Sequence, residues 1–167
     1  MKTGLFAIIA TLVFLSCATP AKKNTAPDLY QLIMQPGASY DSTMAARLGG
    51  NDNGMKAYVM AFLKKGPNRS QDSLTAVQLQ KAHLENINRM AEAGKLVIAG
   101  PFIDNWEVRG IYIFDVPTVE EARELTETDP AIQAGRLVME LHPWYGPAAL
   151  PLLLPLHKRL EKKNVAD

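Results

Sequence analysis

The sequence predicts an α+β fold of the ferredoxin-like type, in which a four-stranded antiparallel sheet carries two helices on one face. The first observation behind this prediction is the order of strand-like and helix-like segments in residues 55–146, which is βαββαβ. The second is topological, because right-handed crossovers in that order place both helices on the same side of the sheet. The third is that the first and third strands, which are central in this topology, are apolar at both parities.

A strand, a long helix and a short strand make up the first half of this domain. Residues 55–63 are apolar in a nearly unbroken run that ends at Lys-Lys-Gly-Pro, so they form a strand covered on both faces. From Leu74 to Ala91 apolar residues recur with helical spacing, and Gly94 is typical of a helix C-terminus. Residues 96–99 then form a short buried strand.

The second half follows a connecting loop, residues 102–107. Residues 108–116 form the third strand, and Thr118 opens the second helix with a capping box. Asp129, followed by proline, begins a further short helical turn that ends at a glycine. Residues 137–141 are predicted to be the last strand.

The first seventeen residues read as a bacterial lipoprotein signal peptide. Lys2 precedes an apolar stretch of eleven residues, Leu5 to Leu15, which is shorter than the roughly 20 residues that a membrane-spanning helix needs. The segment ends at Cys17, the only cysteine of the chain, in a context that resembles a lipobox. We therefore predict lipidation of Cys17 and a lipid-anchored protein of the bacterial cell envelope that faces the periplasm. An ordinary signal peptide that is cut elsewhere is the alternative.

The remaining segments flank the domain. Residues 18–54 are predicted to be a tether and an irregular extension with a short helix near residues 40–48, because they are rich in small, polar, proline and glycine residues. Residues 147–167 form a C-terminal tail with a leucine run between prolines and a basic, helix-like end.

Composition argues against several classes of function. The chain of 167 residues has 18 Lys+Arg and 17 Asp+Glu, a net charge of +1, so nothing indicates a nucleic-acid partner. A single cysteine excludes an intrachain disulfide, and the three histidines lack the spacing of metal ligands. There is no phosphate-binding loop, no Gly-x-Ser-x-Gly and no Cys-x-x-Cys. We predict neither a metal nor a cofactor.

The face of the sheet opposite the two helices is predicted to be apolar on the central strands, and the helices cannot bury it. An open patch of several apolar side chains is unusual on a monomer. We therefore predict a homodimer in which the open sheet faces of two copies pack together about a two-fold axis.

Several short stretches of the domain resemble the YCII-related (YciI-like) family. In chain order they are Ala82-His83-Leu84, Gly94-Lys95-Leu96, Ala99-Gly100-Pro101, Thr128-Asp129-Pro130 and Ala134-Gly135. The resemblance implies a dimeric α/β barrel in which each subunit holds a pocket between sheet and helices. That family is similar to muconolactone-isomerase-type proteins, and a few members are linked to lyase or dehydrochlorinase-like steps on ring-cleavage or hydroxylated aromatic compounds. The active pair that it implies is His83 and Asp129.

His83 is also the leading candidate from its position alone. Its spacing places it at the edge of the buried face of the long helix, where a neighbouring carboxylate would orient the ring for proton transfer. The alternative is a structural histidine bonded to a backbone carbonyl. Asp129 can orient His83 or cap the short helix that follows it, and the two roles are compatible.

Other candidates for substrate binding lie in the connecting loop, beside it and at the end of the last strand. They are Asp104, Trp106, Arg109, His142 and Trp144. Loop polarity and strand-end packing are the alternatives for them. Tyr58 and Tyr112, on the central strands, are expected to pack against the second copy.

Two functions stay open from the sequence. The first is a small lyase or isomerase that uses a His/Asp acid–base pair on a small organic substrate of aromatic or enol type. The second is a non-catalytic envelope module that binds a small molecule or assembles with partners. One fold hosts many functions, so the resemblance does not name the reaction.

Overall fold

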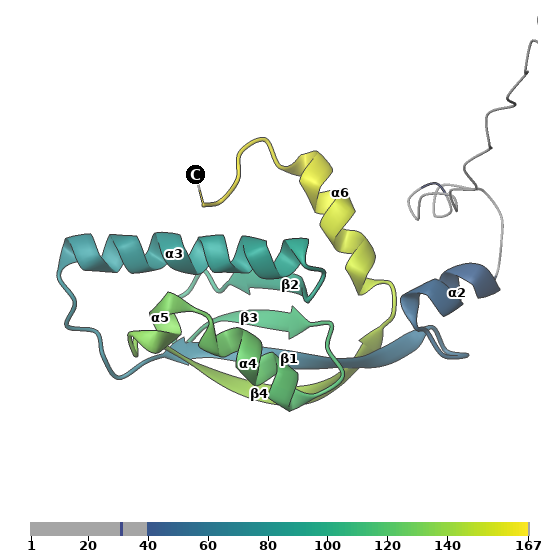
Figure 1. Ribbon diagram of the computed structural model, residues 1–167, viewed down its shortest axis with the longest axis horizontal. Coiled ribbons are helices and arrows are strands. Elements are labelled where there is room, and N and C mark those ends of the chain that lie inside the picture. The colour runs from purple at the N-terminus through teal and green to yellow at the C-terminus, as the bar shows by residue number, and fades with distance from the viewer. Residues whose placement is uncertain (1–30, 32–39, 167) are drawn as a thin grey trace, which may run out of the picture.

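The computed structural model describes residues 31 and 40–166, and Figure 1 shows how their helices and strands are arranged. Four strands form one antiparallel sheet in the order β2-β3-β1-β4. Their bounds are β1 Met55–Lys65, β2 Leu96–Pro101, β3 Val108–Phe114 and β4 Leu137–Pro147. The predicted ferredoxin-like fold class is confirmed.

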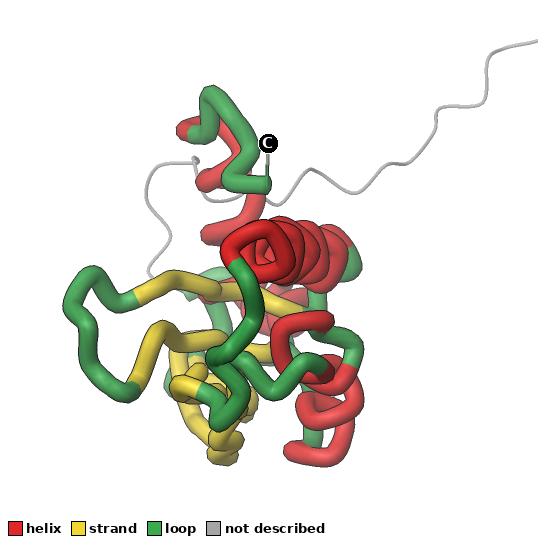
Figure 2. Tube along the Cα trace, turned by 90° about the vertical axis from the view of Figure 1, so that its left-hand side faces the viewer, coloured by secondary structure: helices red, strands yellow, loops and turns green. Residues whose placement is uncertain are grey.

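The helices α3, α4 and α5 gather on one side of the strands, as Figures 1 and 2 show. Their bounds are α3 Ser73–Glu92, α4 Val119–Glu127 and α5 Pro130–Gln133. Each begins at a side chain that accepts a hydrogen bond from a backbone N–H of the first turn. The capping residues are Asp72 for α3, Thr118 for α4 and Asp129 for α5. Gly94, just beyond α3, has a positive φ of 69°, which glycine adopts without strain.

The last strand is longer than the sequence predicted. It continues past Leu141 to Pro147, and Pro143 pairs with Val59 of β1. Proline is tolerated there because β4 is an edge strand, with a neighbour on one side only. The edge position is a property of the sheet, so the residues of β4 by themselves do not indicate it.

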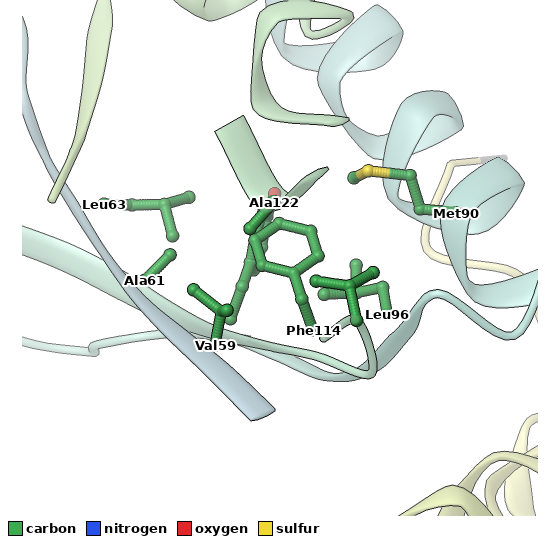
Figure 3. Packing of buried hydrophobic residues seen from close by; sticks show 9 residues of the cluster. Val59, Ala61, Leu63, Met90, Leu96, Phe114 and Ala122 are labelled. Carbon is green, nitrogen blue, oxygen red and sulfur yellow. The ribbon is translucent and has the colours of Figure 1, made fainter. Parts of the chain in front are cut away.

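The main hydrophobic core lies between the sheet and the helices. Figure 3 shows side chains of β1 and β3 meeting Met90 of α3 and Ala122 of α4. On β1 the contributing residues alternate, Val59, Ala61 and Leu63, as expected for one face of a strand. This core fixes α3 against the sheet.

The opposite side of the sheet is covered in part by the C-terminal segment. After β4 the chain forms a short 3₁₀ helix, η1 (Leu150–Leu152), and then α6 (Leu153–Leu160). Leu150 and Leu154 pack against a second cluster, in which Tyr58, Val97 and Ile113 are buried. Part of the cover that we expected from a second copy therefore comes from the chain itself.

The N-terminal part of the description begins with helix α2, Ser42–Leu48, which Asp41 caps. It agrees with the short helix that the sequence suggested. Among residues 31 and 40–166, no helix combines the length and apolar character needed to cross a membrane. The expected signal peptide, Cys17 and most of the tether lie outside the described residues.

Candidate active site

A cavity of about 470 Å³ lies between α3 and the sheet. Its walls include His83 and Leu84 of α3 and Tyr112 of β3. Its volume is in the usual range for small-molecule sites, about 300–1,000 Å³. We therefore take it as the candidate active site. The main hydrophobic core holds its two walls, α3 and the sheet, together.

Asp129 contacts His83 at the buried edge of this cavity. The distance from His83 Nδ1 to Asp129 Oδ2 is 2.6 Å. Asp129 is fully buried and His83 is 7% exposed. The other carboxylate oxygen, Oδ1, accepts the N–H of Ala131 at 2.8 Å and so caps α5. Both roles that the sequence allowed for Asp129 are present at once.

The second ring nitrogen of His83 meets Tyr112. The hydroxyl oxygen of Tyr112 lies 3.3 Å from His83 Nε2, and the two rings are stacked with centroids 6.3 Å apart. Burial, with the negative charge of Asp129 adding to it, raises the pKa of Tyr112 far above its usual range. The phenol is thus a neutral donor at physiological pH.

One placement of protons gives each contact of this triad a donor and an acceptor. An ionised Asp129 only accepts, so His83 Nδ1–H donates to it. His83 Nε2 is then the acceptor, and the Tyr112 hydroxyl donates to it. In this placement the Nε2 atom of the imidazole accepts at the cavity wall, and a carboxylate behind the ring orients it.

Three arginines line the same cavity: Arg69, Arg109 and Arg136. Arg69 donates to the carbonyl of Arg136 at 3.2 Å, and Arg136 donates to Gln71 Oε1 at 3.1 Å. Arg109 donates to the carbonyl of Asp104 at 2.9 Å. All of these acceptors are neutral. The cavity wall therefore carries positive charge beside the imidazole.

A shift in strand register brings Arg109 to this wall. Leu63 of β1 pairs with Gly110, whereas the next residue, Lys64, pairs with Val108, so Arg109 is left out of the register. Bulges of this kind change the direction of a side chain relative to the regular alternation of a strand. Strict alternation would instead have put Arg109 on the outer side of the sheet.

The remaining predicted binding residues do not line the cavity. Asp104 lies in the β2–β3 loop, where its side chain accepts the N–H of Trp106 at 3.3 Å, and Trp106 is 73% exposed. His142 and Trp144 are on the outer side of β4, in contact with Phe62 and Tyr58 respectively.

The physical reason for the position of His142 and Trp144 is the alternation of β4. Leu137, Met139 and Leu141 face the helices, so the residues between them face the other way. His142 and Trp144 therefore do not line this cavity, and their predicted role in substrate binding finds no support in it. Cys17, the predicted lipidation site, lies outside the described residues.

Sequence reasoning missed Tyr112, Arg69 and Arg136 as site residues. Tyr112 was expected to pack against a second copy, but it shares the helix-facing side of β3 with Phe114 and meets His83. Its position could have indicated this, because residues two apart on a strand face the same side of the sheet and Tyr112 is two residues from Phe114. Arg69 and Arg136 gave no signal, because they sit in connections whose path depends on the folded chain.

Groups of metal-binding side chains are absent from the described part of the chain. No three His, Cys, Asp or Glu residues there lie close enough together to hold a metal ion. The titratable groups at the cavity are His83 with its partner Asp129, Tyr112 and the arginines. The arrangement can move a proton and can bind a negative charge.

Comparison with known proteins gives a match to a family and likenesses to solved structures. Residues 57–145, just over half of the chain, match the model of the YCII-related domain. No curated protein matches the sequence. One similar solved structure is 5-chloro-2-hydroxyhydroquinone dehydrochlorinase from Burkholderia phenoliruptrix in complex with 2,5-dihydroxybenzoquinone. Identity to it is 17%, the TM-score is 0.40, and the match covers 52% of this chain and 92% of that chain. The family match spans β1 through β4, the strands that carry the cavity.

Proposed function

Because the chain belongs to the YCII-related domain family, we propose that it is a small acid–base enzyme of the lyase or isomerase type. In this proposal His83 moves a proton on a small organic substrate in the cavity, and Asp129 holds the imidazole. The observation that carries it is the 2.6 Å contact between His83 Nδ1 and Asp129 Oδ2, with Nε2 left toward the cavity.

The step that this geometry supports is removal of a proton from a carbon next to a carbonyl. His83 Nε2 takes the proton, and the electron pair of the C–H bond moves to form an enolate. In an isomerase the imidazolium returns the proton to a different carbon. In a lyase the electron pair instead expels a leaving group from the neighbouring carbon, and the leaving group takes the proton from the imidazolium. Atoms and charge balance in both cases without a further reagent.

Asp129 and Tyr112 have distinct supporting roles in this proposal. Asp129 stabilises the imidazolium that forms when Nε2 takes the proton. The neutral Tyr112 hydroxyl leaves Nε2 when substrate enters and donates to the developing enolate oxygen, which needs only rotation about its C–O bond. Its raised pKa keeps it protonated for that purpose.

A non-catalytic binding module is the second candidate. The observation that favours it is that Nε2 already has a hydrogen-bond partner, the Tyr112 hydroxyl. In that case the cavity would hold a small molecule with no proton transfer to carbon. The two candidates differ in whether a bound compound exchanges a carbon-bound hydrogen.

Hydrogen exchange in deuterium oxide tests the proposal. The protein is incubated with small carbonyl compounds that carry a C–H bond next to the carbonyl, and loss of the proton signal is followed by NMR. We expect exchange with wild-type protein and a loss of about 100-fold or more in His83→Gln. The control is His157→Gln, which changes an exposed histidine on α6 that does not line the cavity. Binding without exchange in the wild type would support the second candidate instead.

The cellular location is a separate proposal that rests on the sequence. We propose that Cys17 is lipidated and that the protein is anchored in the bacterial envelope, facing the periplasm. Metabolic labelling with a fatty-acid analogue tests it. Label is expected in the wild type and absent in Cys17→Ser; label that persists in the variant would contradict it.

The homodimer is proposed to form through the outer side of the sheet that the tail leaves open. Phe62 and Ile111 are half-buried there, beside Lys64, Glu140 and His142. Analytical ultracentrifugation of the Cys17→Ser protein tests it. A stable monomer would contradict the proposal, and a dimer that Phe62→Glu dissociates would support it.

A further inference from the structure

The charge of the cavity indicates which class of substrate it takes. We infer that it binds a small organic anion, an apolar body with one carboxylate, and that Arg109 and Arg136 hold the carboxylate with Arg69 at the entrance. The inference deepens the proposed function, since it names the substrate class of the same site. The experiment below lets either one fail without the other.

The first argument is the balance of charge on the cavity wall. The residues lining it include three guanidinium groups and no aspartate or glutamate. The nearby carboxylate, Asp129, is fully buried and already accepts from His83 and from the N–H of Ala131. It therefore supports the imidazole and leaves the positive charge of the arginines without a counter-ion in the wall.

The second argument is a contrast with four lysines of the same molecule. Lys56, Lys64, Lys81 and Lys158 each form an ion pair with an aspartate or glutamate. The three cavity arginines take part in none of the ion pairs found within residues 40–166. Their partners are backbone carbonyls and side-chain amides, and each arginine uses a single Nη1 atom for them, which leaves most of the five N–H donors of each guanidinium for a ligand.

The third argument is that the backbone gathers the arginines at one end of the sheet. The N–H of Gly66 donates to the carbonyl of Arg136 at 2.9 Å, which ties the connection carrying Arg69 to the start of β4. The N–H of Lys65 donates to the carbonyl of Glu107 at 3.0 Å, which ties the same end of β1 to the start of β3. Arg69 and Arg136, from two connections, and Arg109, from β3, thus line the same cavity, where a carboxylate could be held bidentately.

The rest of the wall is apolar and suits a hydrocarbon or aromatic body. Leu63, Leu84, Ile87 and Leu137 line it. Arg109 and Tyr112 are three residues apart on β3, which is roughly 10 Å along a strand. A six-membered ring with one carboxylate is of a size that this spacing and the cavity volume of about 470 Å³ accommodate.

The positive wall also agrees with the proposed proton transfer. An enolate adds negative charge to the substrate as His83 takes the proton. Guanidinium groups fixed in a partly buried site stabilise that charge without having to reorganise. The arginines would thus contribute twice, by attracting the anion and by favouring the enolate.

Titration calorimetry with matched ligands tests the inference. The probes are benzoate, its neutral isostere benzamide, and inorganic phosphate, each titrated into the wild-type protein at low salt. We expect benzoate to bind about tenfold or more tightly than benzamide, because hydrogen bonds to charged groups are worth more than neutral ones. Benzamide binding as tightly as benzoate would overturn the inference, and so would phosphate binding more tightly than benzoate.

Variants locate the binding to the arginines. Arg109→Gln and Arg136→Gln should each weaken benzoate binding by about tenfold and leave benzamide unchanged. Arg109→Lys, which keeps the charge but not the fork, should lie between Arg109→Gln and wild type. Lys81→Gln is the matched control, because it removes one positive charge from α3 outside the cavity. Equal losses in Lys81→Gln and the arginine variants would overturn the inference.

The outcomes separate this inference from the proposed catalysis. Circular dichroism first checks that each variant is folded. If Arg109→Gln does not fold, Arg109→Lys replaces it in the binding experiment. Arginine-dependent benzoate binding without hydrogen exchange would support the anion site and contradict the enzyme. Hydrogen exchange of neutral carbonyl compounds, together with equal binding of benzoate and benzamide, would support the enzyme and contradict the anion site.

Discussion

His83 and Asp129 are separated by 46 residues in the chain, yet His83 Nδ1 lies 2.6 Å from Asp129 Oδ2. The carboxylate has a second partner, because its Oδ1 accepts the N–H of Ala131 at the start of α5. One buried side chain therefore fixes both the ring of His83 on α3 and the first turn of α5. The cap and the candidate acid–base pair are the same interaction network.

Asp129→Asn tests this double role. An amide has one oxygen, so it cannot accept from both His83 and Ala131, and one buried donor loses its partner. We expect the free energy of unfolding to fall by about 1–3 kcal/mol. We also expect the imidazole nitrogen NMR signals of His83 to lose the pattern of a single Nδ1–H tautomer.

Asp72→Asn is the control for that variant. Asp72 caps α3 at the surface, where asparagine is as good a cap and can rotate. Its stability should stay close to that of wild type, with the signals of His83 unchanged. Two variants with the same stability and the same His83 tautomer would contradict the double role of Asp129.

Because of Tyr112, the free energy of unfolding is expected to depend on pH in the alkaline range. Burial raises the pKa of Tyr112 far above its usual value of 10.0, and burial with the charge of Asp115 raises the pKa of Tyr58 to about 12. Above about pH 10 the unfolded chain releases these protons while the folded chain keeps them, so the stabilising effect is full below pH 10 and falls as pH rises.

Denaturant unfolding at several pH values checks this dependence. Tyr112→Phe should lose less stability than wild type between pH 10 and 12, whereas Tyr40→Phe, at an exposed residue, should follow wild type. If Tyr112→Phe and wild type decline in parallel, the phenol does not titrate as its burial indicates.

Gly66 is predicted to be sensitive to the smallest substitution. A Cβ at this position would lie 2.2 Å from the carbonyl oxygen of Gly135, which is backbone and cannot move aside alone. Gly66→Ala should lower the free energy of unfolding by about 2 kcal/mol or more and weaken benzoate binding, because it disturbs the contact with Arg136. Gly100→Ala is the control, since a Cβ there meets nothing within 4 Å. Thermal unfolding compares them, and equal losses would refute the steric account.

The C-terminal segment is predicted to stabilise the domain. Leu154 of α6 packs against the buried cluster on the outer side of the sheet, whereas Leu160 of the same helix is 83% exposed. Leu154→Ala should lower the free energy of unfolding by about 1 kcal/mol, because part of its apolar surface is buried, and Leu160→Ala should have almost no effect. Denaturant unfolding measures both, and equal values would mean that α6 does not cover the sheet.

Local pattern in the chain was enough for the order of the elements and for the fold class. Helical spacing from Leu74, the cap at Thr118 and the glycine at Gly94 are all read within a few residues, and each lies where expected in the structure. Helical spacing also identified His83 as a candidate, and the family resemblance added Asp129 as its partner. Their roles in catalysis stay a prediction, although the contact between them is present.

Which face of the sheet each strand side chain points to could not be predicted locally, because it depends on pairing between distant segments. The register shift beside Leu63 brings Arg109 to the cavity, and the parity of β3 turns Tyr112 toward His83. The alternation of β4 takes His142 and Trp144 to the outer side. The cover that α6 gives to that side depends likewise on where the tail folds back.

The amino-acid order alone thus settled which segments are helices and strands and how they connect, because those preferences arise from neighbours within a turn or two. Only the folded chain decided which side chains share the cavity: His83, Tyr112 and the three arginines come from four separate segments of the sequence. The physical reason is that strand register and loop path are set by long-range packing, and a one-residue shift in register sends a side chain to the opposite face.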